Sequence, residues 1–398
     1  MSQSDEKFLN TARNIEKALS FINAKKEPSS DIERAKYHYD CINLYTERKK
    51  RLVLDVLALF ALPLSVLFTC IYTITHMNIS TGQIDCVIYS GGENTNLPNV
   101  DAILPQSLKN RYSKIENIDI HGRRALFATG LVSKDIIRTL VKCIVKYPFL
   151  TYFNFSVFMH LCTINRIIRK YNPKTILSIA GENDFSTSLL TEFCEENNTK
   201  YTCLMHGEYF LEANHAFVRF SEIYVWDEYY VKQFDKLRAK TGKYHIYIPN
   251  RFNMHLKLQE PTYFIGYYLQ EFSERQLLAI RDTLKIFTKL GFKCKIRPHK
   301  RASDMETVNR IFKDENGIDI EMFSISIEES YCNVKYIVSM YSTVLSEAYY
   351  NNLHPVIDDI SDPYLYRSLK DIMNINLNRI DKRLSSIVDD VKNRKNDD

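Results

Sequence analysis

Short apolar runs rich in β-branched and aromatic residues alternate with longer amphipathic runs over most of the chain. Each short run leads into a polar loop, and the segments between them carry apolar residues at helical spacing. Buried strands that alternate with helices are typical of a parallel sheet covered by helices on both faces. The pattern therefore predicts the α/β class. In the first half of the chain, a strand that runs into a polar loop is expected in each of the segments 85–92, 175–184, 201–208, 222–228 and 244–250. In the second half, strands are expected at 263–268, 292–296, 318–323, 334–340 and 355–357.

These strands fall into two groups, which a proline-bounded segment at 249–261 separates. In the second group Ser273 and Gln276 form a capping-box pattern where a helix begins. Two such groups predict two Rossmann-like lobes, and a length of 398 residues suits two domains better than one. The expected division is a helical, membrane-associated region at 1–80, α/β lobes at 81–255 and 256–375, and a charged tail at 376–398.

An uncharged run of nineteen residues, Val56 to Ile74, follows the basic residues 48–51. Its length is that of a membrane-crossing helix. Pro63 in its middle favours instead a helix that lies in the interface, or one that breaks, enters one leaflet and returns. A true span and a buried core helix remain alternatives. The polar, acidic start of the chain does not resemble a signal peptide.

A second uncharged run, 147–165, is less apolar and rich in aromatic residues. We expect a helix packed within the first lobe. The alternative is an aromatic face, flanked by basic residues, that rests on lipid headgroups.

Charge and cysteine content limit the ligands and the kinds of site that are expected. There are 53 Lys and Arg residues against 48 acidic ones, a net charge of +5, which suits phosphorylated small molecules or an anionic membrane and does not demand nucleic acid. The nine cysteines are scattered singly, so neither a disulfide framework nor a zinc knuckle is expected. We expect no metal site and no cofactor.

The segment Tyr336 to Asp359 carries the strongest local signal for a ligand. A strand ends near Met340, Ser342 and Thr343 follow at the expected start of a helix, and Glu347 lies one turn later. Backbone N–H groups and hydroxyls at a helix N-terminus bind phosphate, and a carboxylate one turn on accepts hydrogen bonds from ribose. The simpler alternative is that Ser342 or Thr343 only caps the helix.

A basic loop follows the strand at 292–296. Arg297, His299, Lys300 and Arg301 occupy four of five consecutive positions, a density that fits a phosphate clamp. A solvated surface loop is the alternative.

These two segments resemble the donor lobe of GT-B-fold bacterial glycosyltransferases. There, a strand–loop–helix of the form S-x-x-S-T-x-x-x-E-A, followed by P-V-I, holds the nucleotide phosphate. The matching positions are Ser339, Ser342, Thr343, Glu347, Ala348 and 355–357. The group with a His-Pro pair after the preceding strand contains sialyltransferases, Kdo transferases, and the polyol-phosphate transferases of capsule and teichoic-acid synthesis. Here Pro298-His299-Lys300 stands in place of His-Pro, a departure from the pattern of the group that binds cytidine nucleotides.

The acceptor side offers three candidates for the base in an inverting transfer. They are His206, Asp184 and Glu208, in that order, each at the end of an expected strand. The pair His206-Gly207 resembles the His-Gly loop of the polyol-phosphate transferases. A buried histidine with satisfied hydrogen bonds is the alternative for His206, and Glu182 is expected to lie at a helix N-terminus.

The resemblance implies a metal-independent, inverting glycosyltransferase with a GT-B-like pair of lobes. Its donor is a nucleotide-activated sugar, with a CMP-linked sugar as one option, and its acceptor is a surface polysaccharide or lipid-linked glycan of the kind made in capsule polysaccharide biosynthesis. We expect it at the cytoplasmic face of the bacterial inner membrane, peripheral or re-entrant. A transferase of the CDP-glycerol type and a non-catalytic scaffold in polysaccharide assembly are the alternatives.

Overall fold

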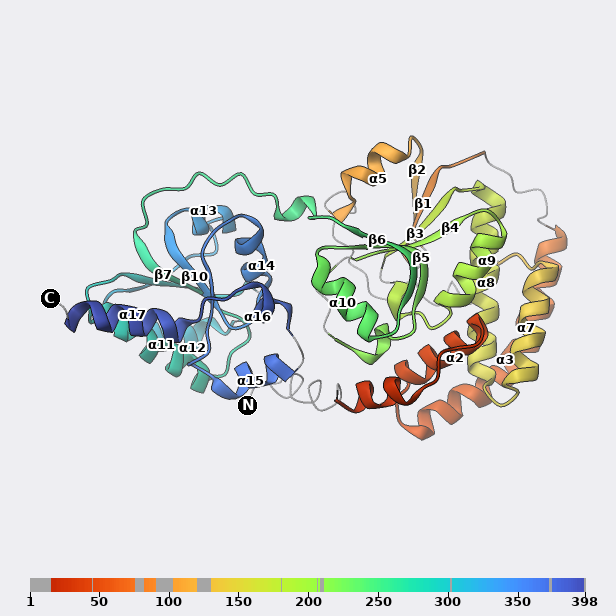
Figure 1. Ribbon diagram of the computed structural model, residues 1–398, viewed down its shortest axis with the longest axis horizontal. Helices are drawn as coiled ribbons and strands as arrows, with labels where there is room; N and C mark the ends of the chain where they lie inside the picture. The colour runs from red at the N-terminus through yellow and green to blue at the C-terminus, as the bar shows by residue number, and fades with distance from the viewer. Residues whose placement is uncertain are drawn as a thin grey trace. The chain divides into compact units, whose positions relative to one another are not determined.

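The computed structural model describes residues 16–44, 46–75, 82–90, 103–119, 130–179, 181–205, 207, 211–300, 303–371 and 374–396. The chain forms two compact units, one from Lys17–Asn250 and one built on Arg251–Asp398. Each unit contains a parallel β-sheet covered by helices (Figure 1). The α/β class with two Rossmann-like lobes is confirmed.

The first unit has a six-stranded parallel sheet in the order β2-β1-β3-β4-β5-β6. β3 is buried at all five positions, which explains its continuous apolar sequence. The strands are β1 (Cys86–Ser90), β2 (Ile115–Asp119), β3 (Thr175–Ile179), β4 (Lys200–Leu204), β5 (Arg219–Val225) and β6 (Lys240–Ile246).

Helices pack on this sheet and on one another. α9 packs on β4 and β5, α8 packs on α9, and α3 and α7 pack on the outside of α8. α8 buries fifteen of its residues, so the expected packed helix is confirmed and an aromatic face on lipid is wrong for α8 itself. Phe149, in the turn before α8, is 89% exposed. The helices are α2 (Asp31–Ile42), α3 (Arg48–Thr75), α5 (Gln106–Arg111), α7 (Lys134–Lys146), α8 (Thr151–Tyr171), α9 (Thr187–Glu196) and α10 (Glu228–Lys236), with 3₁₀ turns η1 (Gly181–Asn183) and η2 (Ala213–His215).

The N-terminal helices belong to the first unit and do not stand apart from it. α2 packs on α9, and Asp31 of α2 pairs with Arg219 of β5. α3 continues through Pro63 over 28 residues, so the helix does not break and return. Only Ala58 and Thr69 of α3 are buried, so the core-helix alternative is wrong as well.

The second unit has a five-stranded parallel sheet in the order β11-β10-β7-β8-β9. The strands are β7 (Tyr263–Tyr268), β8 (Cys294–Arg297), β9 (Ile318–Ile320), β10 (Val334–Ser339) and β11 (Pro355–Ile357). The helices are α11 (Glu274–Thr288), α12 (Met305–Phe312), α13 (Ile327–Cys332), α14 (Thr343–Tyr350), α15 (Pro363–Asp371), α16 (Ile375–Arg379) and α17 (Leu384–Asn396), with η3 (Asn250–Phe252) at the junction of the units.

The segment 376–398 was expected to be a charged tail, but its described part packs into the second unit. Leu384, Ile387, Val388 and Val391 of α17 are buried in the same apolar cluster as the strands β7 and β8. These four positions recur at helical spacing, so one face of an otherwise charged helix is apolar.

Candidate functional site

The order of strands in the second unit marks one edge of the sheet as a ligand site. From β7 the chain runs first to β8 on one side, and later it returns to β10 on the other side of β7. Loops that leave neighbouring parallel strands in opposite directions open a crevice at the carboxyl ends of those strands, where ligands bind in this class of fold. The crevice is expected between the loops that follow β7 and β10.

Hydrogen bonds join the loops at this edge. Gln270, after β7, donates from Nε2 to Oγ of Ser342, after β10, at 2.7 Å. Ser303, in the loop after β8, donates from Oγ to the Gln270 carbonyl at 3.4 Å, and the His299 N–H donates to the same Oγ at 2.8 Å. The structure therefore brings His299 and Ser342 into one network, although 43 residues separate them in the chain.

The start of α14 contains the expected helix cap and is compatible with the expected phosphate site. Ser342 is the N-cap, and its Oγ accepts from the Val344 N–H at 3.3 Å. Thr343 is exposed beside it. The cap does not exclude an anion, because the N–H groups of the first turn still point out of the helix and carry its positive end.

The basic residues of the loop after β8 differ in their surroundings. Arg297 donates to Glu321 at 2.6 Å and to the Ile325 carbonyl at 2.8 Å. His299 and Lys300 are exposed. Arg297 therefore fixes the end of β8, and among the described residues of this loop His299 and Lys300 are the basic ones that reach the surface.

Glu321 also neutralises a buried lysine behind Arg297. Lys295 is 2% exposed and donates to Glu321 at 2.6 Å, to the Ser330 carbonyl at 2.9 Å and to Asn333 at 3.0 Å. Burial lowers the pKa of Lys295. Burial opposes the ionisation of Glu321, but its hydrogen bonds to Lys295, Ser330 and Arg297 outweigh burial and lower the pKa of the carboxyl.

Glu347 lies one turn into α14 and accepts a hydrogen bond from the Tyr331 hydroxyl at 2.6 Å. This contact holds the carboxylate expected to bind ribose.

A hollow of about 260 Å³ lies where α11 and α15 begin. Arg275 and Arg367 line it, and Gln276 donates across it to Asp362 at 2.9 Å. Nothing in the sequence marks these arginines as neighbours, because they lie in two helices about ninety positions apart.

The first unit has its own edge of this kind, between β1 and β3. The η1 turn follows β3 and leads to Asp184, one of the expected bases. Oδ2 of Asp184 lies 3.2 Å from Nδ1 of His160 on α8, and Ser186 donates from Oγ to Oδ1 of Asp184 at 2.6 Å. His160 also contacts Ser186, at 2.8 Å between Nδ1 and Oγ.

The electrostatics of this pair favour His160 as the group that titrates. Burial opposes the charged imidazole, but the Asp184 carboxylate outweighs burial and raises the pKa of His160 above its ordinary value. Burial likewise opposes the ionised carboxylate, but His160 and Ser186 lower the pKa of Asp184 to about 2. Asp184 therefore remains ionised near neutrality, and His160, whose side chain is 37% exposed, exchanges the proton.

The other acceptor-side candidates are placed less favourably or lie outside the described residues. Glu182 is fully buried in η1, and Cys203 lies 3.5 Å from its carboxylate. His206, Glu208 and Arg301 fall outside the described part of the chain, so their roles stay predictions. Within the described ranges, no three His, Cys, Asp or Glu side chains gather as metal ligands.

Comparison with known proteins gives similarity of fold only. No protein-family model matches the sequence, and a search of curated proteins found no significant match. Among solved structures, a glycosyltransferase from Rickettsia africae is similar at 13% identity over 70% of this chain and 80% of its own, with a TM-score of 0.40. The calicheamicin glycosyltransferase CalG4 is similar at 11% identity over 73% of this chain and 83% of its own, also with a TM-score of 0.40.

A UDP-GlcNAc 2-epimerase from Neisseria meningitidis, bound to UDP-GlcNAc, is similar at 9% identity over 73% of this chain and 90% of its own, with a TM-score of 0.39. Identities and TM-scores at this level assign neither a family nor an activity. The chain is an α/β protein of two parallel-sheet units, similar in fold to glycosyltransferases and to an epimerase of a nucleotide sugar.

Proposed function

We propose that the protein is a glycosyltransferase that moves a sugar from a nucleotide-activated donor to a glycan or lipid-linked acceptor. The observation that carries this proposal is the network at the carboxyl edge of the second sheet, where Gln270, Ser303 and Ser342 join the three loops around the switch in strand order. Such an edge is where α/β sheets bind nucleotides.

In this proposal the donor phosphate lies at the start of α14. Thr343 and the first-turn N–H groups hydrogen-bond its oxygens, and His299 and Lys300 supply positive charge from the loop after β8. Glu347, held by Tyr331, accepts from the ribose hydroxyls. These groups stabilise the charge that develops on the departing nucleotide, which is the contribution that a divalent ion makes in other transferases, so we propose that transfer is metal-independent.

The first unit supplies the acceptor base. We assign this role to His160, with Asp184 as the residue that orients it. The carboxylate faces Nδ1, so a neutral imidazole keeps its N–H on that side and presents Nε2 to the proton of an acceptor hydroxyl. When that proton leaves, Asp184 stabilises the imidazolium that forms. The sequence-based candidates His206 and Glu208 remain alternatives for the base.

The expected location follows from the substrates. Nucleotide-activated sugars of a bacterium are cytoplasmic, and a lipid-linked acceptor is held in the membrane. We therefore propose that the enzyme acts at the cytoplasmic face of the inner membrane. A CMP-linked donor is the version that the resemblance to the sialyltransferase group favours.

A thermal-shift screen tests the donor site. A ligand that binds the native state raises its melting temperature, by the equivalent of about 2.7 kcal/mol at a hundred times the Kd. The purified protein is screened against CMP, CDP, UDP and GDP, and against their sugar and glycerol conjugates. We expect one nucleotide to raise the melting temperature, and His299→Ala to reduce that rise.

His354→Ala is the matched control, since His354 is an exposed histidine just before β11, at the opposite edge of the same sheet. An unchanged response in His299→Ala would remove this residue from the donor site. Folded protein that responds to no nucleotide would contradict the enzyme and leave a scaffold. Preference for CDP-glycerol would indicate polyol-phosphate transfer, and conversion of a nucleotide sugar without an acceptor would indicate epimerisation.

A further inference from the structure

α3 turns its apolar side chains outward, whereas an ordinary surface helix turns them towards the core. From Leu52 to Ile74, every residue that is exposed is apolar, whereas the polar residues of the same stretch are all turned at least partly inward. The exposed side chains include Phe60 and Phe68, at 68% and 63%. The inward polar residues are Asp55, Ser65, Thr69, Cys70, Tyr72 and Thr73. A helix with this pattern is not stable against water on its outer face, because soluble helices turn their apolar side inward.

Hydrogen bonds attach α3 to its unit near both ends. Oδ1 of Asp55 accepts from the Tyr152 N–H at 2.9 Å, at the start of α8. Oγ1 of Thr73 accepts from the Val132 N–H at 2.9 Å, just before α7. Eighteen residues of helix separate these two anchors, about 27 Å along the axis.

This lateral attachment argues against a helix that crosses the bilayer. The hydrocarbon core is about 30 Å thick, so a crossing α3 would carry the side of its unit through most of the membrane. α8, on which α3 packs, lies in turn against α9 and the sheet. The attached length therefore favours a helix that lies flat, with the rest of the unit in water.

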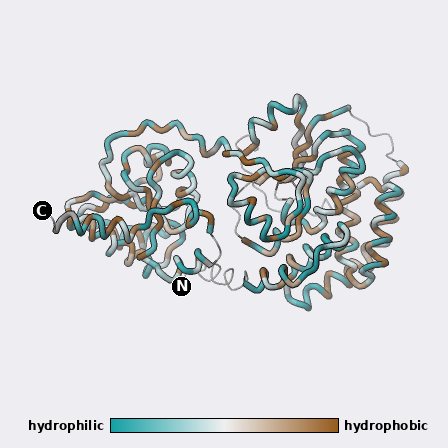
Figure 2. The backbone as a smooth tube through the Cα atoms, viewed as in Figure 1, coloured by the Kyte–Doolittle hydropathy of each residue, from teal (hydrophilic) through white to brown (hydrophobic). Residues whose placement is uncertain are grey.

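α7 packs on α8 as α3 does, and it also carries exposed apolar residues. Val141 and Val145 of α7 are exposed at 51% and 76%, and Phe149, in the turn between α7 and α8, at 89%. Figure 1 shows α7 and α3 on the same outer side of the sheet, and Figure 2 shows the hydropathy along both segments.

Basic residues border this surface. Arg48, Lys49, Lys50 and Arg51 form the first turn of α3, with no acidic residue among them. Lys134, Lys142 and Lys146 are exposed on α7. Basic side chains next to an apolar face are attracted to anionic lipid headgroups, whereas a purely protein partner would not require them.

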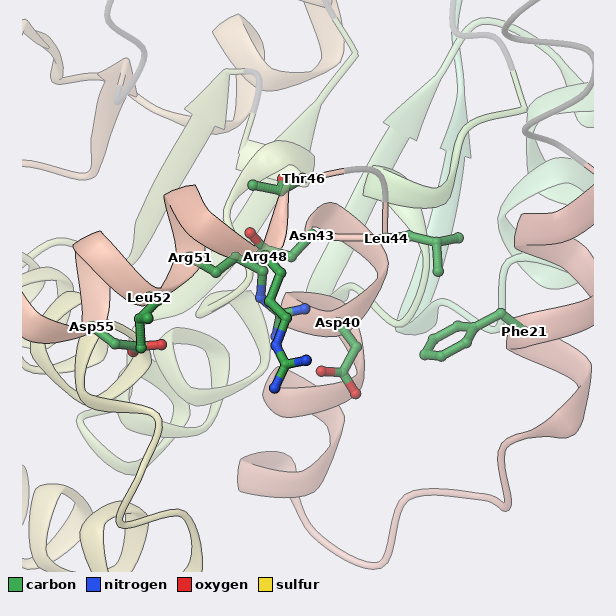
Figure 3. A pocket seen from close by; sticks show the side chains of 9 residues that line it. All are labelled: Phe21, Asp40, Asn43, Leu44, Thr46, Arg48, Arg51, Leu52 and Asp55. Atoms are coloured by element: carbon green, nitrogen blue, oxygen red, sulfur yellow. The ribbon is translucent and has the colours of Figure 1, made fainter.

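A hollow of about 610 Å³ lies at the same end of α3. In Figure 3 the side chains of Arg48 and Arg51 extend from the first turn of α3 towards Asp40 of α2. Phe21 and Leu44 line the opposite side of the hollow. The opening lies next to the exposed Leu52, where the apolar face begins. Its size and its arginines suit the phosphate of a lipid headgroup whose chains continue into the leaflet.

We infer that the face formed by α3, α7 and Phe149 inserts into one leaflet of an anionic bilayer, with α3 parallel to the membrane plane and a lipid phosphate at Arg48 and Arg51. The protein is thus monotopic on this face. This inference deepens the membrane location in the proposed function and does not depend on nucleotide binding. The thermal-shift screen is carried out in detergent and tests nucleotide binding alone. Failure of nucleotide binding would not contradict membrane insertion, and failure of membrane insertion would not contradict nucleotide binding.

The first experiment is flotation of the full chain with vesicles of phosphatidylcholine alone and of phosphatidylcholine with phosphatidylglycerol. We expect binding to both, stronger with the anionic lipid. Phe60→Glu with Phe68→Glu should reduce partitioning at least about tenfold, because each introduces a charge into the leaflet. The matched control is Leu258→Glu with Met322→Glu, two exposed apolar residues of the other unit, and it should bind like wild type.

Arg48→Gln with Arg51→Gln tests the headgroup contact. We expect this variant to show a weaker preference for phosphatidylglycerol, since the lysines of α3 and α7 remain, and to keep binding to neutral vesicles. A preference that survives unchanged would overturn the assignment of the phosphate to this hollow.

Depth-dependent quenching by brominated lipids tests the orientation. The chain has one tryptophan, Trp226, which is 1% exposed and out of reach of the lipid. Reporters are introduced one at a time as Val53→Trp, Leu64→Trp and Ile74→Trp. An in-plane helix places all three at the same shallow depth, whereas a crossing helix places Leu64→Trp deepest and would overturn the inference. Absence of vesicle binding, with a dimer in light scattering that Phe60→Glu dissociates, would mean that a second copy covers the face.

Discussion

Nδ1 of His160 lies 3.2 Å from Oδ2 of Asp184, although the two residues come from a helix and from a loop 24 positions later. Ser186 donates to the other carboxylate oxygen, so Asp184 is held from both sides. An ionised carboxylate behind an accessible imidazole orients the ring and raises its proton affinity. In the proposed mechanism, Asp184 is therefore the residue that positions the base, and His160 is the group whose protonation controls activity.

The pH profile of kcat/KM tests this assignment. The base works as neutral imidazole, so activity should rise as the pH increases through the pKa of His160, which Asp184 raises above its ordinary value. In Asp184→Asn the negative charge is gone while burial remains, so the pKa of His160 falls and the acidic limb moves to lower pH. The plateau should also fall, because the ring loses its orientation.

His160→Ala should lower kcat by about 10² to 10⁴, the usual contribution of a general base. Ser186→Ala is the control, since it removes the hydroxyl that contacts both Asp184 and His160 and leaves the charge of the carboxylate in place. Its acidic limb should stay near that of wild type. A His160→Ala variant with normal kcat would contradict the assignment and would return the role of base to His206.

The turn before Asp184 depends on a glycine. A Cβ at Gly181 would lie 2.3 Å from Oγ and 2.9 Å from Cβ of Ser178, closer than side chains approach one another. Gly181→Ala must therefore displace the η1 turn, and we expect slower turnover and a lower melting temperature. Ser178→Gly removes both clashing atoms and should restore turnover in the double variant. Failure of this rescue would mean that Gly181 matters for another reason than space.

The fold was largely predictable because strands such as β3 and β7 are mostly buried and have mostly apolar sequences. The boundaries of β7 and β11 agree residue for residue with the expectation. β2 was missed because Ile115–Asp119 contains three polar residues in five, and a strand at the end of a sheet need not be apolar throughout.

The candidate site could be predicted from the sequence only where its residues are neighbours in the chain. Ser342, Thr343 and Glu347 lie together because one strand–loop–helix carries them. His160 was missed because nothing near it in the sequence marks it, and only the packing of α8 beside the loop after β3 brings Asp184 to it. Likewise, the sequence presents Arg297 among other cations, and the carboxylate that pairs with it lies 24 positions away, at Glu321.

The buried pair Lys295–Glu321 should dominate the stability of the second unit. Glu321→Gln leaves Lys295 charged and buried without a counterion, which typically costs about 3–5 kcal/mol of the free energy of unfolding. Because the pKa of Glu321 is lowered on folding, its contribution is present above the unfolded pKa and is lost as the pH falls below it. Urea unfolding followed by circular dichroism at several pH values measures both effects.

The control is Glu274→Gln, which removes the exposed partner of Arg310. Exposed pairs contribute little, so this variant should unfold like wild type. Equal losses in the two variants would mean that the buried network has no special role in holding β8 and β9.

Gln270 and Ser342 should act as a unit in binding the donor, because their hydrogen bond joins the loops on the two sides of the crevice. Gln270→Ala removes the bridge, and Ser342→Ala removes both the bridge and the cap of α14. We expect each variant to weaken nucleotide affinity, Ser342→Ala more strongly, since loss of a cap costs about 1 kcal/mol by itself. The double variant should be no weaker than Ser342→Ala, with a coupling energy of about 0.5–3 kcal/mol in calorimetric titrations. Additive losses would show that the two loops bind the nucleotide independently, and would remove the bridge from the donor site.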